Sequence, residues 1–134
     1  MSAVRSAVLA LSALTVVGGC ADVGNREAAA GDIATHLLTA VAGRDGAAAC
    51  AVLAPDTAAE LEQSAGKPCD QAILDEDLPA PAPINSADVY GQWAQVRLPG
   101  DTLFLAVFPG GWRVVAAGCK PRPSRPYDCA LQGG

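Results

Sequence analysis

The chain has few of the residues that most enzymes and nucleic-acid-binding proteins depend on. Its 134 residues include one histidine and six aromatic side chains, and 14 acidic residues outnumber nine lysines and arginines, for a net charge of −5. Binding to phosphate backbones needs a basic face, so this balance argues against nucleic acid as the main partner. The length fits one domain and excludes a large multidomain enzyme.

Bulky apolar residues are also scarce. Hydrophobic residues make up 51% of the chain, but 28 residues are alanines, which bury little surface each. The core is therefore expected to be modest, and crosslinks would add useful stability.

The N-terminal segment has the pattern of an export signal. Arg5 precedes an uncharged apolar stretch over residues 7–17, which is too short to span a bilayer and is typical of a secretory signal peptide. Residues 14–20, L-T-V-V-G-G-C, resemble the lipobox of bacterial lipoproteins. This resemblance implies that residues 1–19 are removed, that Cys20 carries a diacylglycerol, and that residues 20–25 form a tether. The alternative is an ordinary signal peptide followed by an incidental cysteine.

The remaining four cysteines are an even number, which in an exported domain indicates disulfides. Of the three connectivities, proximity in the sequence favours Cys50–Cys69 and Cys119–Cys129. A zinc site is the alternative, but the chain has no C-x-x-C and a single histidine, so we predict neither a metal nor a cofactor.

The first half of the domain is predicted to be helical. Apolar residues recur at steps of three and four over residues 26–44, with Asn25 as the cap and Gly43 at the stop. Asp45 is expected to cap a helix over 46–54. Thr57 and Glu60 suggest a capping box for a third helix ending near residue 64, and a short helical turn is expected after Cys69.

The second half is predicted to be a sheet. Alternate prolines over 78–83 indicate an extended connector. Period-two patterns then predict strands over 86–90, 92–98, 102–108 and 112–118, with Pro-Gly turns before the last two. We therefore expect one α+β domain over residues 26–134, with N-terminal helices packed on a three- to four-stranded antiparallel sheet.

This order of elements resembles the NTF2-like and cystatin-like cones. The sequence G-W-R-V at 111–114, Cys119 and P-Y-D-C at 126–129 are also similar to a group of small, uncharacterised lipoproteins of high-GC Gram-positive bacteria. The segment C-A-V-L-A-P at 50–55 is similar too. The resemblance implies an exported, lipid-anchored and disulfide-linked protein, and it implies no activity.

Three groups of residues are candidate sites. Asp32 and His36 are one helical turn apart, as a carboxylate orienting a general base would be, although a nucleophile is missing and such pairs are common on helix surfaces. The acidic run 75–77 lacks the spacing of a calcium loop and is expected to be a solvated helix end. The aromatic residues Trp93, Phe104, Phe108 and Trp112 either line a pocket between helices and sheet or form the core.

A fourth candidate is the proline-rich segment 120–126, enclosed by the expected Cys119–Cys129 bridge. Lys120, Arg122 and Arg125 make it a preorganised basic hairpin that is suited to anionic lipid or cell-wall polymer. The alternative is a solvated loop that the prolines merely shape.

The sequence thus favours a non-enzymatic binding or accessory module on the extracytoplasmic face of the cell membrane, held by lipid on Cys20. Its expected partners are the membrane and either a small apolar ligand or an envelope protein. The alternatives are an NTF2-like enzyme that uses Asp32 and His36 on a small apolar substrate, and a purely structural envelope protein.

Overall fold

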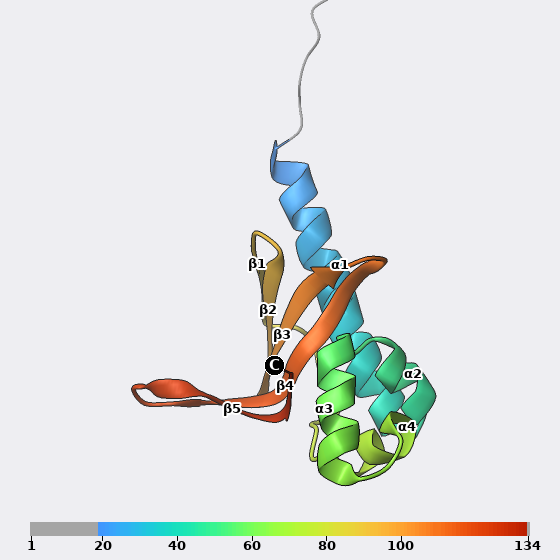
Figure 1. The fold of residues 1–134 in the computed structure, drawn as a ribbon. Helices are drawn as coiled ribbons and strands as arrows, with labels where there is room; N and C mark the ends of the chain where they lie inside the picture. Colours follow the sequence, from blue (N-terminus) through green and yellow to red (C-terminus); the bar gives the residue numbers. More distant parts are fainter. Residues whose placement is uncertain (1–18, 134) are drawn as a thin grey trace, which may run out of the picture.

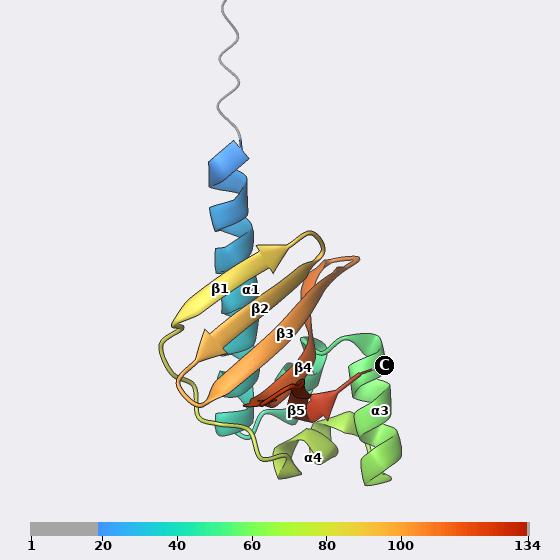
Figure 2. The same ribbon diagram turned by 90° about the vertical axis from the view of Figure 1, so that its left-hand side faces the viewer.

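The chain forms an α+β domain in which helices cover one face of an antiparallel sheet (Figures 1 and 2). The computed structural model describes residues 19–133, with side chains from residue 22 onward. The helical elements are α1 (Gly19–Ala42), α2 (Gly46–Ala51), α3 (Pro55–Ala65), α4 (Cys69–Ala72) and the 3-10 turn η1 (Ile73–Asp75). The strands are β1 (Ser86–Tyr90), β2 (Trp93–Leu98), β3 (Asp101–Phe108), β4 (Gly111–Arg122) and β5 (Arg125–Gln132).

The first turns of α1 project beyond the rest of the domain (Figures 1 and 2). Residues 22–25 are exposed, and Ala30 is the first fully buried apolar residue. The expected tether over residues 20–25 is therefore helical, and Asn25 lies within the helix and does not cap it. At 1.5 Å per residue, the helix spans about 16 Å from residue 19 to residue 30. No helix of the described chain is both long and apolar enough to cross a membrane.

The shorter helices form a compact unit joined by a disulfide between Cys50 and Cys69. Asp45 caps α2 as expected, because its Oδ1 accepts the N–H of Ala48 at 3.0 Å. Gly46 allows α2 and α4 to approach closely, since a Cβ atom there would lie 1.8 Å from the carbonyl oxygen of Asp70. The disulfide therefore joins two helices that already touch.

The sheet has five strands in sequential order, not the three or four that were expected. The connector and the predicted β1 are as expected, but β4 runs to Arg122 and pairs with the additional strand β5. Proline lacks the ladder donor, so Pro121 and Pro126 give no local indication of strand there. The structure accommodates Pro126 because β5 is an edge strand.

The core lies between α1 and the inner face of the sheet, which is the face that the helices cover. Leu37 and Leu38 of α1 are fully buried. They belong to one cluster with apolar residues of the short helical elements and of the strands, including Leu53, Ile73, Val96, Leu103, Leu105, Val114 and Leu131.

A β-bulge in β4 explains why the expected capping box is absent. Val114 pairs with Leu105 and Ala116 with Phe104, so Val115 is an extra residue whose carbonyl is free of the β3 ladder. Thr57 donates its hydroxyl to this carbonyl at 2.8 Å. Because Thr57 is used in this way, α3 begins earlier, with Pro55 in its first turn and no side-chain cap.

Candidate functional site

Strands β4 and β5 form a long β-hairpin, and the end of this hairpin projects away from the helices (Figure 1). Its strands are linked by a disulfide between Cys119 and Cys129, which are directly opposite each other in the β4–β5 ladder. We call residues 119–129 the basic hairpin, since they contain Lys120, Arg122 and Arg125. It projects from the outer face of the sheet, which is the face opposite the helices (Figure 1).

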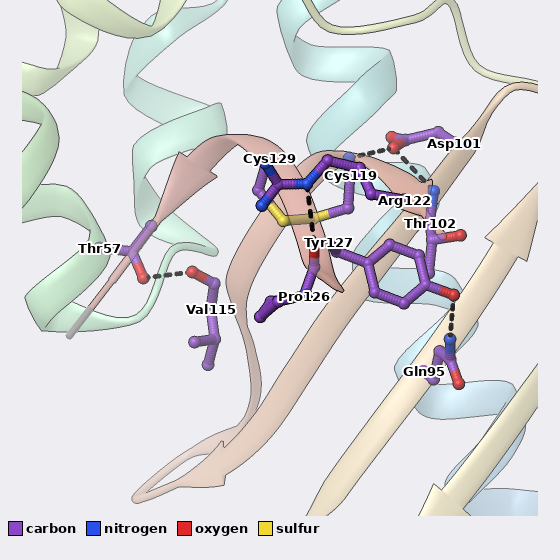
Figure 3. The surroundings of a disulfide bond; sticks show 10 residues. All are labelled: Thr57, Gln95, Asp101, Thr102, Val115, Cys119, Arg122, Pro126, Tyr127 and Cys129. Carbon is purple, nitrogen blue, oxygen red and sulfur yellow. Dashed lines mark hydrogen bonds between the residues drawn. A yellow bond between two sulfur atoms is a disulfide. The ribbon is translucent and has the colours of Figure 1, made fainter. Parts of the chain in front are cut away.

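Gly118 and Asp101 direct β4 away from β3 at the base of the basic hairpin. Gly118 has a φ of 65°, a backbone conformation that favours glycine. The Oδ1 atom of Asp101 then accepts the N–H of Cys119 at 2.9 Å and that of Thr102 at 2.7 Å (Figure 3). Asp101 therefore satisfies a backbone donor where β4 no longer pairs with β3.

The carboxyl group of Asp101 is an unusual buried charge. The residue is only 5% exposed, and within residues 19–133 its Oδ2 atom has no hydrogen-bond partner. Burial raises the pKa of the Asp101 carboxyl, while the backbone donors and the nearby Lys120 act in the opposite direction.

Tyr127 holds the basic hairpin against the outer face. Its ring lies edge-on to Phe104 of β3. Its hydroxyl accepts a hydrogen bond from Nε2 of Gln95 in β2 at 3.3 Å (Figure 3). The contact reaches across the sheet, so the disulfide, Tyr127 and Asp101 together fix the direction of the basic hairpin.

The three predicted cations are all exposed on the basic hairpin. Arg122 and Arg125 are directly opposite each other beside the turn, and Lys120 is opposite Asp128. Arg122 also donates from Nε to the carbonyl of Pro126 at 3.0 Å, which orders its guanidinium. Opposed like charges are destabilising in a strand pair, so the end of the basic hairpin is suited to an anion.

The prediction that Trp93, Phe104, Phe108 and Trp112 share a pocket or a core is wrong. Only Trp112 faces the helices, where the guanidinium of Arg26 in α1 lies 5.4 Å from its ring centroid. Strand alternation and pairing place Trp93, Phe104 and Phe108 on the outer face instead, and Trp93 is 54% exposed. Tyr90, directly opposite Trp93, is 62% exposed.

Asp32 and His36 lie on the exposed side of α1. Both line an open groove of about 580 Å³ between α1 and α2, together with the hydroxyl-bearing residues Thr35 and Thr39. Both side chains are exposed, and no hydrogen bond or ion pair joins them. The structure thus brings the two residues to one groove without the burial or pairing that usually tunes a general base.

The acidic run 75–77 lies at the end of the helical region. Asp75 forms an ion pair with Lys67, which lowers the pKa of the Asp75 carboxyl. Glu76 is partly buried, and this burial raises the pKa of its carboxyl. Among the residues that the structure describes, no group of three His, Cys, Asp or Glu side chains is placed to hold a metal ion.

Sequence reasoning missed Asp101 and Tyr127 as positioning residues. Asp101 follows Pro99 and Gly100, a sequence that indicates a turn and does not indicate a buried carboxyl, whereas Tyr127 stands out only as part of the P-Y-D-C sequence. The one signal for Tyr127 was its place beside a cysteine in a segment with prolines on both sides. The predicted lipidation site, the side chain of Cys20, lies outside the described part of the chain, as do residues 1–18.

Comparisons with known proteins do not add a relative: no family model, no curated protein and no solved structure matches the chain.

Proposed function

We propose that the chain is a lipid-anchored extracytoplasmic protein of the bacterial cell envelope that acts as a non-enzymatic binding module. Two disulfides in a small domain favour an oxidising compartment. The lipobox-like sequence before Cys20 supplies the anchor. Because α1 begins next to this cysteine and projects from the domain, it would act as a rigid spacer between lipid and domain.

The observation that carries the binding proposal is the opposed pair Arg122 and Arg125 on a hairpin fixed in space. The helical half of the domain is acidic, with eleven acids and three bases over residues 22–77. Over residues 78–134 the balance reverses to three acids and five bases. An anionic ligand would be attracted to the basic hairpin and repelled from the helices. The module would therefore bind such a ligand with the basic hairpin facing the ligand and the helices facing away from it.

The direction of the basic hairpin favours a polymer of the envelope over the lipid surface that holds the anchor. The basic hairpin projects sideways near the end of α1 that is far from Cys20 (Figure 1). With α1 upright on a membrane, the arginines would be held above the lipid headgroups. An anionic polymer that extends away from the membrane would meet them there.

Charge reversal tests the binding proposal. In the double variant Arg122→Glu/Arg125→Glu we expect binding to purified cell-envelope fragments to fall at least about tenfold at low salt, because two attractions become repulsions. Lys67→Glu changes an exposed cation of the helical half and serves as the control. Unchanged sedimentation of the double variant with the fragments would contradict the proposal. Preferential binding to mixed phosphatidylcholine and phosphatidylglycerol vesicles would assign the hairpin to the membrane instead.

The anchor needs its own experiment. Cys20→Ser removes the only thiol that the lipobox-like sequence offers, so we expect the variant to leave the membrane fraction. Its retention there would contradict lipidation.

We also propose that the domain has an NTF2-like or cystatin-like fold, because such cones likewise place helices on one face of an antiparallel sheet. The alternative function, an NTF2-like enzyme, depends on the groove that Asp32 and His36 share. Asp32→Ala and His36→Ala should leave envelope binding unchanged if the module is non-enzymatic. Loss of an envelope phenotype in both variants, with binding intact, would favour the enzyme.

A further inference from the structure

A second surface lies at the end of the sheet that faces the projecting turns of α1, where the β1–β2 and β3–β4 turns lie (Figures 1 and 2). Four of the six aromatic residues flank these two turns. We call them the aromatic end: Tyr90, Trp93, Phe108 and Trp112. Trp112 is buried and Phe108 partly so, but Tyr90 and Trp93 are more than half exposed and directly opposite each other.

The aromatic end is fixed to α1. Arg26 of α1 donates from Nη2 to the carbonyl of Gly91 in the β1–β2 turn, and its guanidinium also lies over the ring of Trp112. The N–H of Val107 donates to the carbonyl of Gln92 at 3.0 Å, which joins the two turns. The exposed rings therefore keep one position relative to the N-terminal part of α1.

Exposed apolar side chains gather at this end of the domain. The described chain has five large hydrophobic residues that are exposed. Val23 lies in the first turns of α1, Tyr90 and Trp93 flank the β1–β2 turn, and Val107 is next to the β3–β4 turn. Ile84, before β1, is the fifth. Such a concentration of exposed apolar surface marks an interaction site.

The same end of the sheet carries no charge. Residues 89–96 and 102–112, which include both turns, contain no charged side chain. The β2–β3 turn at the opposite end of the sheet lies between Arg97 and Asp101. Transfer of a charge into an apolar medium is costly, so the uncharged turns are the part of the sheet that can enter one.

The aromatic end is also close to the proposed lipid anchor. Arg26, which contacts the β1–β2 turn, is six residues after Cys20, a rise of about 9 Å along α1. The headgroup region of one leaflet is roughly 5–8 Å thick. An upright α1 would place the turn near the outer limit of this region, and a modest tilt would bring the exposed rings into it.

We propose that the aromatic end rests on the membrane surface, with the rings of Tyr90 and Trp93 at the boundary between lipid headgroups and acyl chains. Tryptophan and tyrosine favour this boundary because their rings are apolar while the N–H or O–H group stays hydrated. The inference rests on the proposed function, since lipid on Cys20 supplies the attachment. The aromatic contact then sets the orientation of the domain and leaves the basic hairpin directed away from the lipid.

Tryptophan fluorescence of the unaltered, lipidated protein on phosphatidylcholine vesicles tests the contact. This neutral lipid does not attract the basic hairpin. Phosphatidylcholine brominated on its acyl chains should quench Trp93, and acrylamide should quench it less than in the Cys20→Ser chain free in solution. Trp93→Phe leaves only the buried Trp112 and should lose the quenching by brominated lipid. Equal quenching by acrylamide in both states, without quenching by brominated lipid, would overturn the contact.

A second measurement uses the Cys20→Ser chain, in which the anchor no longer masks weak binding. Adding Tyr90→Ser and Trp93→Ser should lower its partition into phosphatidylcholine vesicles about tenfold, because both rings leave the lipid. Adding Ile84→Ser removes an exposed apolar side chain away from the two turns and should change the partition less than about twofold. Equal losses in the two variants would contradict a contact made by the aromatic end.

These outcomes separate the contact from the proposed function. If the unaltered protein does not stay with the vesicles, the anchor fails and the contact fails with it. If it stays with them while Trp93 remains accessible to acrylamide, only the contact fails. A blue shift of Trp93 emission that grows with the concentration of the Cys20→Ser chain, without lipid, would assign the aromatic end to a second copy of the chain and would also overturn the contact.

Discussion

Tyr127 in the edge strand β5 lies edge-on to Phe104 in β3, with 5.1 Å between the ring centroids. The contact joins the basic hairpin to the central strand of the sheet on the face that the helices leave open. Two of the six aromatic residues are thus used to position a surface element in a domain whose core is poor in aromatic residues. The hairpin is therefore a positioned part of the fold.

Removing the hydroxyl of Tyr127 separates ring packing from hydrogen bonding. Tyr127→Phe should lower the free energy of unfolding by about 1 kcal/mol, since only the bond to Gln95 is lost. Tyr127→Ala should cost more, because the contact with Phe104 is lost as well. Urea denaturation measures both values, with Tyr90→Phe on the exposed end of β1 as the control. An equal loss in Tyr90→Phe would show that the Gln95 bond contributes nothing specific.

The two disulfides should differ in what they support. Cys50→Ala/Cys69→Ala opens a loop with a sequence separation of 19 and should cost about 3 kcal/mol of stability. Cys119→Ala/Cys129→Ala opens a shorter one, with a separation of 10, and should cost somewhat less. Only the second variant releases the basic hairpin, so only it should weaken binding to envelope fragments at a temperature where both variants are folded. Equal weakening in both variants would mean that the loss of binding reflects general destabilisation and not release of the basic hairpin.

Local patterns in the sequence predicted the elements well where one residue acts on its neighbours. Asp45 caps α2, α1 ends before Gly43, and alternation over β2 identifies the face that holds Ala94, Val96 and Leu98. Each of these depends on contacts within one element or on a simple period.

The failures arise where a distant residue decides the outcome. Thr57 was expected to cap a helix, but the bulged carbonyl of Val115, far along the chain, takes its hydroxyl. The prolines of the basic hairpin concealed β5, because no local rule shows that this strand lies at an edge. The outward position of Trp93 follows from the inward position of Ala94, yet a large aromatic residue on a strand is more often in the core. For these residues, contacts with distant parts of the chain determine the position and bonding of the side chain, which the local sequence does not specify.

Two glycine substitutions should have opposite effects on stability, because Gly46 lies at the contact between α2 and α4 and Gly24 lies in open space. Gly46→Ala places a Cβ atom against the carbonyl of Asp70 and should destabilise the domain by about 3 kcal/mol. Gly24→Ala meets no atom within 4 Å in the projecting part of α1. It should stabilise that helix by up to about 1 kcal/mol through helix propensity alone. Thermal unfolding followed by circular dichroism compares them, and a tolerated Gly46→Ala would contradict the close approach.

The buried carboxyl of Asp101 predicts how stability changes with pH. Its pKa in the folded chain lies above the ordinary value of 3.8. At pH values between 3.8 and this raised pKa, the folded chain therefore holds a proton that the unfolded chain has released. The stabilisation from this group is fully present below pH 3.8 and is lost as the pH rises through the raised pKa. Asp101→Asn cannot titrate and should lack this decline.

The pH experiment compares free energies of unfolding of the unaltered protein and of Asp101→Asn from acidic to neutral pH. Burial also raises the pKa of Glu76, and Lys67 lowers that of Asp75, but both groups are present in both proteins and cancel in the difference. The unaltered protein should therefore lose stability relative to the variant as the pH rises. A difference that stays constant would mean that Asp101 carries its charge in the fold at no cost.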